Sequence, residues 1–166
     1  MFKIGDKVIH NSYGLCEIAA IEMQNTYYGK QDCYIIYLNK TKIMIPVSHS
    51  EMLRYPIGKE EIPRVLDRLS NTDNLPGGLH SEERIRLFSE KFKTNDILKI
   101  AEILRDIAFL GETDKLKSQE KSLREQINKL LSDELSFVQN IAKAEALRTI
   151  DNCLRKVRGS AKCRRK

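Results

Sequence analysis

The chain has 166 residues, of which 41% are hydrophobic and 31% charged, and this composition excludes a chain that is disordered throughout. The mean hydropathy of -0.44 and the lack of an uncharged apolar run of about 18 residues argue against a membrane protein. The first residues include Asp6 and no apolar segment, so we expect no secretory signal and a cytoplasmic location. The four cysteines form no C-x-x-C pair, which predicts reduced thiols and neither a disulfide framework nor a zinc site.

The formal net charge of +6 is unevenly distributed along the sequence. Residues 1–70 carry a net charge of +1 and residues 71–154 a net charge of -2, whereas the last twelve residues contain seven Lys or Arg and no acid. We therefore predict that any nucleic-acid surface in the folded body is a local patch of basic side chains rather than a bulk property.

A small β module is predicted between Lys7 and Pro46. Short runs with turn signals between them indicate strands at Lys7–His10, Leu15–Met23, Cys33–Leu38 and Lys42–Ile45. Both faces of the second strand are largely apolar, which favours a small barrel. The helix that follows carries apolar residues on one face and is expected to cover one end of the barrel; these residues are Ile62, Val65, Leu66 and Leu69.

The segment 71–80 is predicted to be a linker, because it combines turn-forming residues with two adjacent glycines. Beyond it the apolar period changes to three or four residues, which predicts four helices in a compact bundle, at about 81–92, 96–110, 118–131 and 133–154. Gly159 and Ser160 are expected to end the last helix and leave a basic tail at 159–166. The predicted fold class is α+β, with domains at 1–70 and 81–158.

No catalytic constellation is evident in the sequence. The three histidines stand apart from other potential ligands, and no nucleophile elbow, phosphate-binding glycine loop or H-E-x-x-H motif occurs. We therefore expect a protein that is not an enzyme and that requires no cofactor and no metal.

Two sets of side chains indicate binding. Tyr27 and Tyr28 precede Gly29 at a predicted hairpin, where a ring could anchor a partner or both rings could fold back over the barrel mouth. Basic residues also occur near the starts of the first and third bundle helices: Arg84, Arg86, Lys91, Lys115, Lys117, Lys121 and Arg124. If the two helix starts are neighbours, these residues form one basic patch; otherwise they are ordinary solvated surface.

Several segments carry a family resemblance in a consistent order. They are Phe2–Val8, Tyr13-Gly14, Ile100–Asp106, Leu116 with Glu120-Lys121, and Glu134–Ser136. Over residues 1 to 154 the chain resembles the CarD family of bacterial transcription regulators. Its first half also looks similar to the polymerase-interacting module of transcription-repair coupling factor.

The resemblance implies a Tudor-like barrel that docks on the β subunit of RNA polymerase and a helical bundle that contacts promoter DNA without reading its sequence. Contact at the upstream edge of the melted region would modulate the stability of the open promoter complex and associate the protein with the nucleoid. The polymerase-binding residues that it implies are Gln24, Tyr27, Tyr28, Ile43, Met44 and Ile45. The implied DNA-binding residues are Leu79, His80, Arg84, Arg86, Lys91, Lys117, Lys121 and Arg124.

Two departures from the family pattern affect this reading. The family places a wedge tryptophan near the first bundle helix, whereas this chain has no tryptophan and offers Leu79 or Ser81 there, of which we favour Leu79. Met44 stands where members of the family carry an arginine, and Gln24 or Asn25 replaces another, so we expect a more apolar polymerase contact.

Two other functions fit the same residues. The helical bundle could bind a protein partner and never touch DNA, which would make the molecule an adaptor. Alternatively, the basic segment from Arg155 to Lys166 could supply most of the DNA affinity. The dependence of binding on salt distinguishes these possibilities, because phosphate contacts release counterions.

Overall fold

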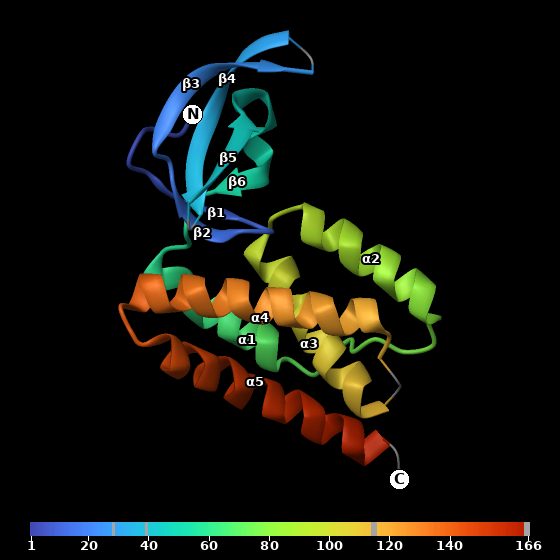
Figure 1. The fold of residues 1–166 in the computed structure, drawn as a ribbon. Helices are drawn as coiled ribbons and strands as arrows, with labels where there is room; N and C mark the ends of the chain where they lie inside the picture. Colours follow the sequence, from blue (N-terminus) through green and yellow to red (C-terminus); the bar gives the residue numbers. More distant parts are fainter. Residues whose placement is uncertain (28, 39, 114–115, 165–166) are drawn as a thin grey trace. The chain divides into compact units, whose positions relative to one another are not determined.

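The computed structural model describes the chain except for Tyr28, Asn39, Asp114, Lys115, Arg165, Lys166 and the side chains of Lys162 and Arg164. The chain folds into two compact units, Met1–Pro56 and Ile57–Lys166. The first consists of strands and the second of helices, which confirms the predicted α+β class (Figure 1). None of the described helices is long and apolar enough to span a bilayer.

The first unit contains two antiparallel sheets of three strands each, in the orders β2-β1-β6 and β3-β4-β5. The strands are β1 (Lys7–His10), β2 (Gly14–Glu17), β3 (Ala20–Thr26), β4 (Gly29–Leu38), β5 (Thr41–Pro46) and β6 (Leu53–Arg54). The expected barrel does not close, because β3 and β5 each have a strand partner on one side only within the described residues. The short 3-10 helix η1 (Val47–Met52) connects β5 to β6.

The predicted strand at 15–23 is two strands in different sheets. β2 pairs with β1, and after Ile18 and Ala19 the chain enters β3, which pairs with β4. Ile18 is buried at this switch, and its backbone N–H donates to the Asp6 carbonyl at 3.0 Å. The change of sheet explains why the segment is apolar on both faces. The core that the two sheets enclose consists of Val8, Cys16, Ile18, Tyr34, Ile36, Ile45 and Leu53.

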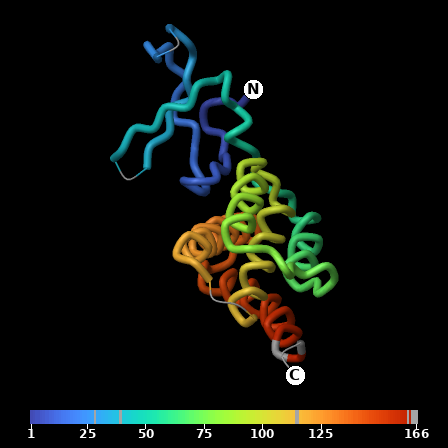
Figure 2. Tube along the Cα trace, turned by 90° about the vertical axis from the view of Figure 1, so that its right-hand side faces the viewer, coloured from blue at the N-terminus to red at the C-terminus, as the bar shows by residue number. Residues whose placement is uncertain are grey.

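The second unit contains five helices that follow the 3-10 turn η2 (Lys59–Glu61). They are α1 (Ile62–Ser70), α2 (Ser81–Lys93), α3 (Ile97–Thr113), α4 (Ser118–Gln139) and α5 (Lys143–Arg164). α3 lies among the other four and packs against each of them (Figures 1 and 2). Its buried position explains its nearly continuous apolar sequence.

α1 belongs to the helical unit, whereas the sequence analysis assigned it to the β module. The buried side chains Ile62, Val65 and Leu69 face α3 and α5, and the two units divide between Pro56 and Ile57 rather than at 71–80. The apolar stripe of α1 was recognised correctly. A stripe of this kind requires a hydrophobic partner but does not identify which one.

The bounds of α3, α4 and α5 also differ from the prediction, and α3 extends to Thr113. α4 continues through Asp133 to Gln139, and its C-cap Asn140 adopts the left-handed conformation typical of a helix C-terminus. α5 continues through Gly159 and Ser160 as far as Arg164. Because Val157 and Ala161 are buried, their packing outweighs the cost of roughly 1 kcal/mol of a glycine in a helix.

His10 ends β1 and accepts a hydrogen bond from the turn that follows. The Ser12 N–H donates to His10 Nδ1 at 3.0 Å, and the imidazole lies against the Tyr13 ring with centroids 4.6 Å apart. Burial lowers the pKa of His10, since the charged imidazole is poorly solvated there. A protonated imidazole also loses the acceptor for Ser12.

We expect the free energy of unfolding to rise with pH through the interval between the folded and the unfolded pKa of His10. In that interval the unfolded chain binds more protons than the folded chain. The stabilisation that neutral His10 gives to the folded state is therefore lost below the interval and complete above about pH 6.5. Urea unfolding across this range, monitored by circular dichroism, provides the measurement. His10→Asn keeps an acceptor atom but does not titrate, and an unchanged pH dependence in this variant would contradict the prediction.

Candidate functional site

A buried ion pair joins the start of α2 to the start of α4. Arg84 Nε donates to Glu120 Oε1 at 2.9 Å and Arg84 Nη2 to Glu120 Oε2 at 3.5 Å. The exposed fractions of the two side chains are 5% and 0%. Burial on this scale is unusual for charged residues unless they are paired.

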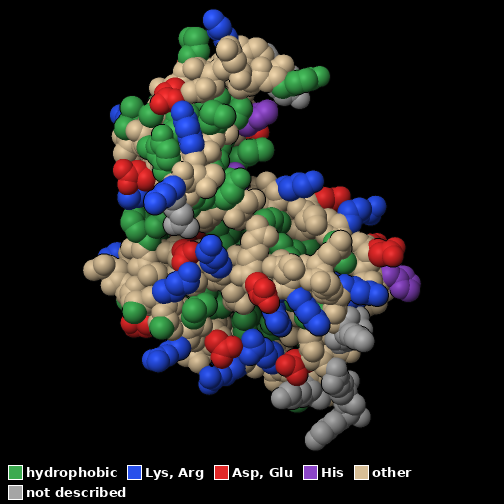
Figure 3. Space-filling view, in the orientation of Figure 1, with side chains coloured by type: hydrophobic (Ala, Val, Ile, Leu, Met, Phe, Trp, Pro, Cys, Tyr) green, Lys and Arg blue, Asp and Glu red, His purple; other side chains and the backbone are tan. Residues whose placement is uncertain are grey.

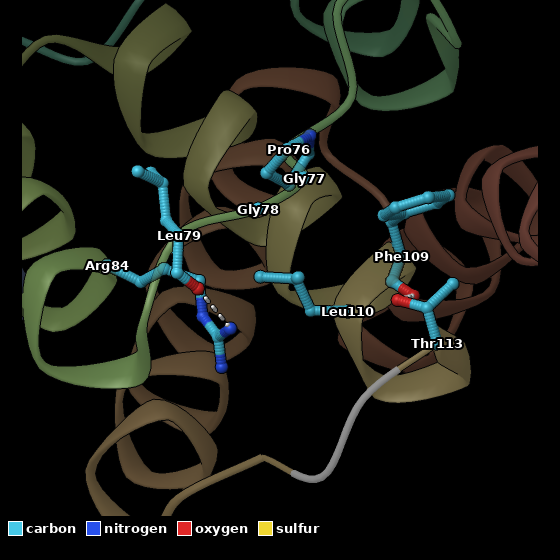
Figure 4. Close-up of a pocket in the computed structure, with 8 residues that line it drawn as sticks. All are labelled: Pro76, Gly77, Gly78, Leu79, Arg84, Phe109, Leu110 and Thr113. Atoms are coloured by element: carbon cyan, nitrogen blue, oxygen red, sulfur yellow. Dashed lines mark hydrogen bonds between the residues drawn. The ribbon is translucent and has the colours of Figure 1, made fainter.

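The same guanidinium also holds the segment before α2. Arg84 Nη1 donates to the Leu79 carbonyl at 3.0 Å (Figure 4). Glu120 Oε2 in turn accepts the Lys117 N–H at 2.8 Å and so caps the first turn of α4. One hydrogen-bonded cluster therefore fixes the linker, α2 and α4 relative to one another.

The ion pair makes the two helix starts neighbours, but the single basic patch stays a prediction, because Arg86 is two residues from Arg84 and so points away from the side of α2 that contacts α4. Arg86, Lys117 and Lys121 are exposed, and Arg124 is half-buried. Arg84 was expected to contact DNA, but the structure buries it against Glu120, so its guanidinium does not face solvent. Lys115 lies outside the described residues.

Lys91 takes part in a second group of charges, centred on Glu102 of α3. Its Nζ lies 2.9 Å from Glu102 Oε2, and Arg68 and Arg105 each approach Glu102 Oε1 at 3.7 Å. Burial opposes ionisation of Glu102, but these cations outweigh it and lower the pKa of its carboxyl group. Lys91 is thus engaged in packing α2 on α3, although its side chain remains partly exposed.

Leu79 and His80 lie in the exposed segment that leads into α2. Leu79 lines a cavity of about 430 Å³ between this segment and the end of α3 (Figure 4). The other lining residues are Pro76, Gly77, Gly78, Arg84, Phe109, Leu110 and Thr113. His80 occupies the N-cap position of α2, and Ser81, the alternative to Leu79, is the first residue of the helix.

The sheet β3-β4-β5 carries the residues that were predicted to bind polymerase. Tyr27 at the β3–β4 hairpin is 96% exposed and Met44 on β5 is 53% exposed. The Tyr27 ring therefore does not fold back over the module. Tyr28 lies outside the described residues.

Three of the other predicted polymerase-binding residues are less accessible. Ile45 is a core residue with an exposed fraction of 4%, so its side chain does not face solvent. Ile43 is half-buried against the same core, and Gln24 is half-buried and donates to Glu22 at 2.8 Å. The structure adds three exposed apolar residues that the sequence analysis did not single out, Ile21 and Met23 on β3 and Tyr37 on β4. Alternation along the strands was the signal that could have identified them.

Among the described residues, no group of three or more His, Cys, Asp or Glu side chains is arranged to hold a metal ion. The accessible features are instead an exposed sheet edge with apolar side chains and a set of basic helix starts. These features fit a protein that binds macromolecular partners.

Comparison with known proteins identifies the family. The model of the CarD-like/TRCF RID domain matches residues 2–57, and that of the CarD C-terminal domain matches residues 64–151. The candidate transcription factor YdeB of Bacillus subtilis (strain 168) is 25% identical over 153 residues, which cover 87% of this chain and 97% of YdeB. The chain belongs to the CarD family of transcription regulators.

Removal of either charge from the Arg84–Glu120 pair should strongly destabilise the protein. We expect Arg84→Met or Glu120→Met each to lower the free energy of unfolding by about 3–5 kcal/mol, because a buried charge is left unpaired. The double replacement Arg84→Met/Glu120→Met should cost less than the two single changes added together.

Urea unfolding of the single and double variants provides the measurement, and a double-mutant cycle gives the coupling energy. Arg86→Met serves as the control, since Arg86 is exposed on the same helix, and it should change stability by no more than about 0.5 kcal/mol. Equal effects of Arg84→Met and Arg86→Met would show that the buried pair is not important.

Proposed function

We propose that this protein binds the β subunit of RNA polymerase through the sheet β3-β4-β5 and contacts promoter DNA through the starts of α2 and α4. The contact stabilises or destabilises the open promoter complex relative to the closed one. Membership of the CarD family supports the transcriptional role. The observation that carries the DNA part is the buried Arg84–Glu120 pair, because it holds the start of α2, with Leu79 before it, against the start of α4, where Lys117 and Lys121 are exposed.

Strand addition is the mode of polymerase binding that the first unit favours. β5 is an edge strand within the described residues, and alternate residues of an edge strand direct backbone N–H and C=O groups away from the sheet. A strand of the partner can pair with those groups while Met44 packs against its side chains.

The DNA contact in this proposal is electrostatic and independent of sequence. Lys and Arg side chains hold phosphates but do not read bases, so the tether to polymerase selects the site. A difference in affinity for the open and the closed promoter then shifts the equilibrium between them. Leu79 is the apolar side chain placed to wedge a base step, at an unstacking cost of roughly a few kcal/mol.

The salt dependence of promoter binding tests the DNA contact. Each phosphate contact contributes about 0.9 to the slope of log affinity against log salt, so Arg86→Gln/Lys121→Gln should reduce that slope by roughly 2 in the polymerase–promoter complex. Lys99→Gln/Lys129→Gln, which also removes two exposed bases, is the matched control and should leave the slope unchanged. Equal slopes for the wild type and the first variant would favour the protein adaptor instead.

The polymerase contact is tested by a charge on β5. Met44→Asp should weaken binding to polymerase core, or to its isolated β lobe, by at least about tenfold, because the carboxylate must be desolvated at the new strand pair. Met52→Asp places the same charge on η1, outside the sheet, and should have little effect. Retention of wild-type affinity by Met44→Asp would contradict docking at β5, and lack of any affinity in the wild type would reject the proposal as a whole.

A further inference from the structure

The last third of α5 has a charge pattern unlike the rest of the chain. No acid follows Asp151, whereas seven Lys or Arg occur from Arg155 onward. This segment lies beyond residues 64–151, which match the CarD C-terminal domain. Its charge is therefore a feature of this chain that the matched part of the family model does not include.

The structure presents the described bases of this segment, Arg155, Lys156 and Arg158, on an anchored helix. Leu154, Val157 and Ala161 are buried in the helical unit, so the backbone of α5 is held in place as far as this point. Arg155 and Lys156 project from the exposed side of the same turns, with Arg155 71% exposed. Ordered bases lose less conformational entropy on binding a phosphate than bases on a flexible segment.

The basic end of α5 lies at the same end of the helical unit as the basic start of α4. The two helices have 22 residues each, pack against each other and are joined by residues 140–142 alone. A connection this short makes them antiparallel, as Figure 1 shows, so α5 returns to the end at which α4 begins. Lys and Arg side chains, with some carboxylates between them, follow α4 and α5 on the face drawn in Figure 3.

The carboxylate of Asp151 competes with a phosphate ligand for two of these bases. Asp151 Oδ1 accepts from Arg158 Nη1 at 2.9 Å, and Asp151 Oδ2 accepts from Arg155 Nε at 3.3 Å. Both pairs are partly exposed, and ion pairs of this kind contribute little to stability. A phosphate can therefore replace Asp151 at low cost, since each guanidinium has further donors.

Stabilisation of the helix end does not account for the pattern. Cations near a helix C-terminus interact favourably with the macrodipole, but the effect is confined to about the last turn. Arg155 and Lys156 precede the end of α5 at Arg164 by two turns. The large exposed apolar residue on α5, Leu147, lies nearer its other end, so the basic part lacks the apolar face of a membrane-binding helix.

We propose that the face of α5 formed by Arg155, Lys156 and Arg158 is a second phosphate-binding surface, which holds the DNA duplex next to the segment contacted by α2 and α4. The inference rests on the proposed DNA contact and extends its footprint. In this proposal Arg155, Lys156 and Arg158 bind phosphates of the DNA backbone. The carboxylate of Asp151 competes with those phosphates for the two arginines.

Binding of the full-length protein to a fluorescent duplex of arbitrary sequence, without polymerase, tests the surface. Arg155→Gln/Lys156→Gln should reduce the salt slope by roughly 2, with weaker binding at low salt. Lys129→Gln/Arg148→Gln removes two exposed bases elsewhere on α4 and α5 and should leave the slope unchanged. Asp151→Asn should act in the opposite direction and tighten binding about two- to fivefold, because it frees two guanidinium groups.

An unchanged slope for Arg155→Gln/Lys156→Gln, equal losses in both double variants, or no tightening in Asp151→Asn would each overturn the proposal. So would binding to phosphatidylglycerol vesicles that depends on Arg155 and Lys156 while DNA binding does not. Arg86→Gln/Lys121→Gln, measured on the same duplex, separates this surface from the first. If Arg86→Gln/Lys121→Gln weakens DNA binding and the α5 variant does not, the α5 surface alone is refuted. The reverse result refutes the contact at α2 and α4.

Discussion

The geometry of the helical unit at its basic end depends on one guanidinium group. Arg84 bonds to the Leu79 carbonyl and to both oxygens of Glu120, and Glu120 caps α4. The linker that contains Leu79 has two adjacent glycines and little structure of its own, so this contact determines where its backbone lies. A buried ion pair adds little net stability compared with an apolar pair, but it is directional. It therefore sets the spacing of exposed bases that come from different helices.

Much of the fold could be predicted from periodicity. The errors occurred where tertiary contacts determine which core an element packs into or where a helix ends. The apolar stripes located all five helices, but neither the stripe of α1 nor the apolar faces of residues 15–23 reveal which core they pack into. The last helix was predicted to begin near Asp133, yet Asn140 in the left-handed conformation marks the actual break. Gly159 and Ser160 resemble a helix end, but the burial of Val157 and Ala161 keeps them helical.

The candidate site could be predicted by residue type but not by orientation. Arg84 and Arg86 are two residues apart, which places them on nearly opposite sides of α2, and only Arg86 is exposed. The same holds for Met44 and Ile45 on adjacent positions of β5. Arg84 precedes the buried Phe88 by four residues, and Glu120 stands three residues after the N-cap of α4. Both positions lie on the buried side of their helices, so the helical period, applied to charged as well as apolar residues, would have identified the pair.

The absence of tryptophan and the basic end of α5 have a common physical consequence. A leucine at position 79 has no planar ring to stack on an exposed base, so a wedge at this position gains less from the melted DNA than an aromatic residue would. More of the interaction must then come from phosphate contacts, which are individually weak and weaken further with salt. Tethering through polymerase raises the local concentration of DNA, and additional bases on a rigid helix increase the affinity without adding sequence preference. If α5 binds phosphates as proposed, its bases compensate in part for the stacking that Leu79 cannot provide.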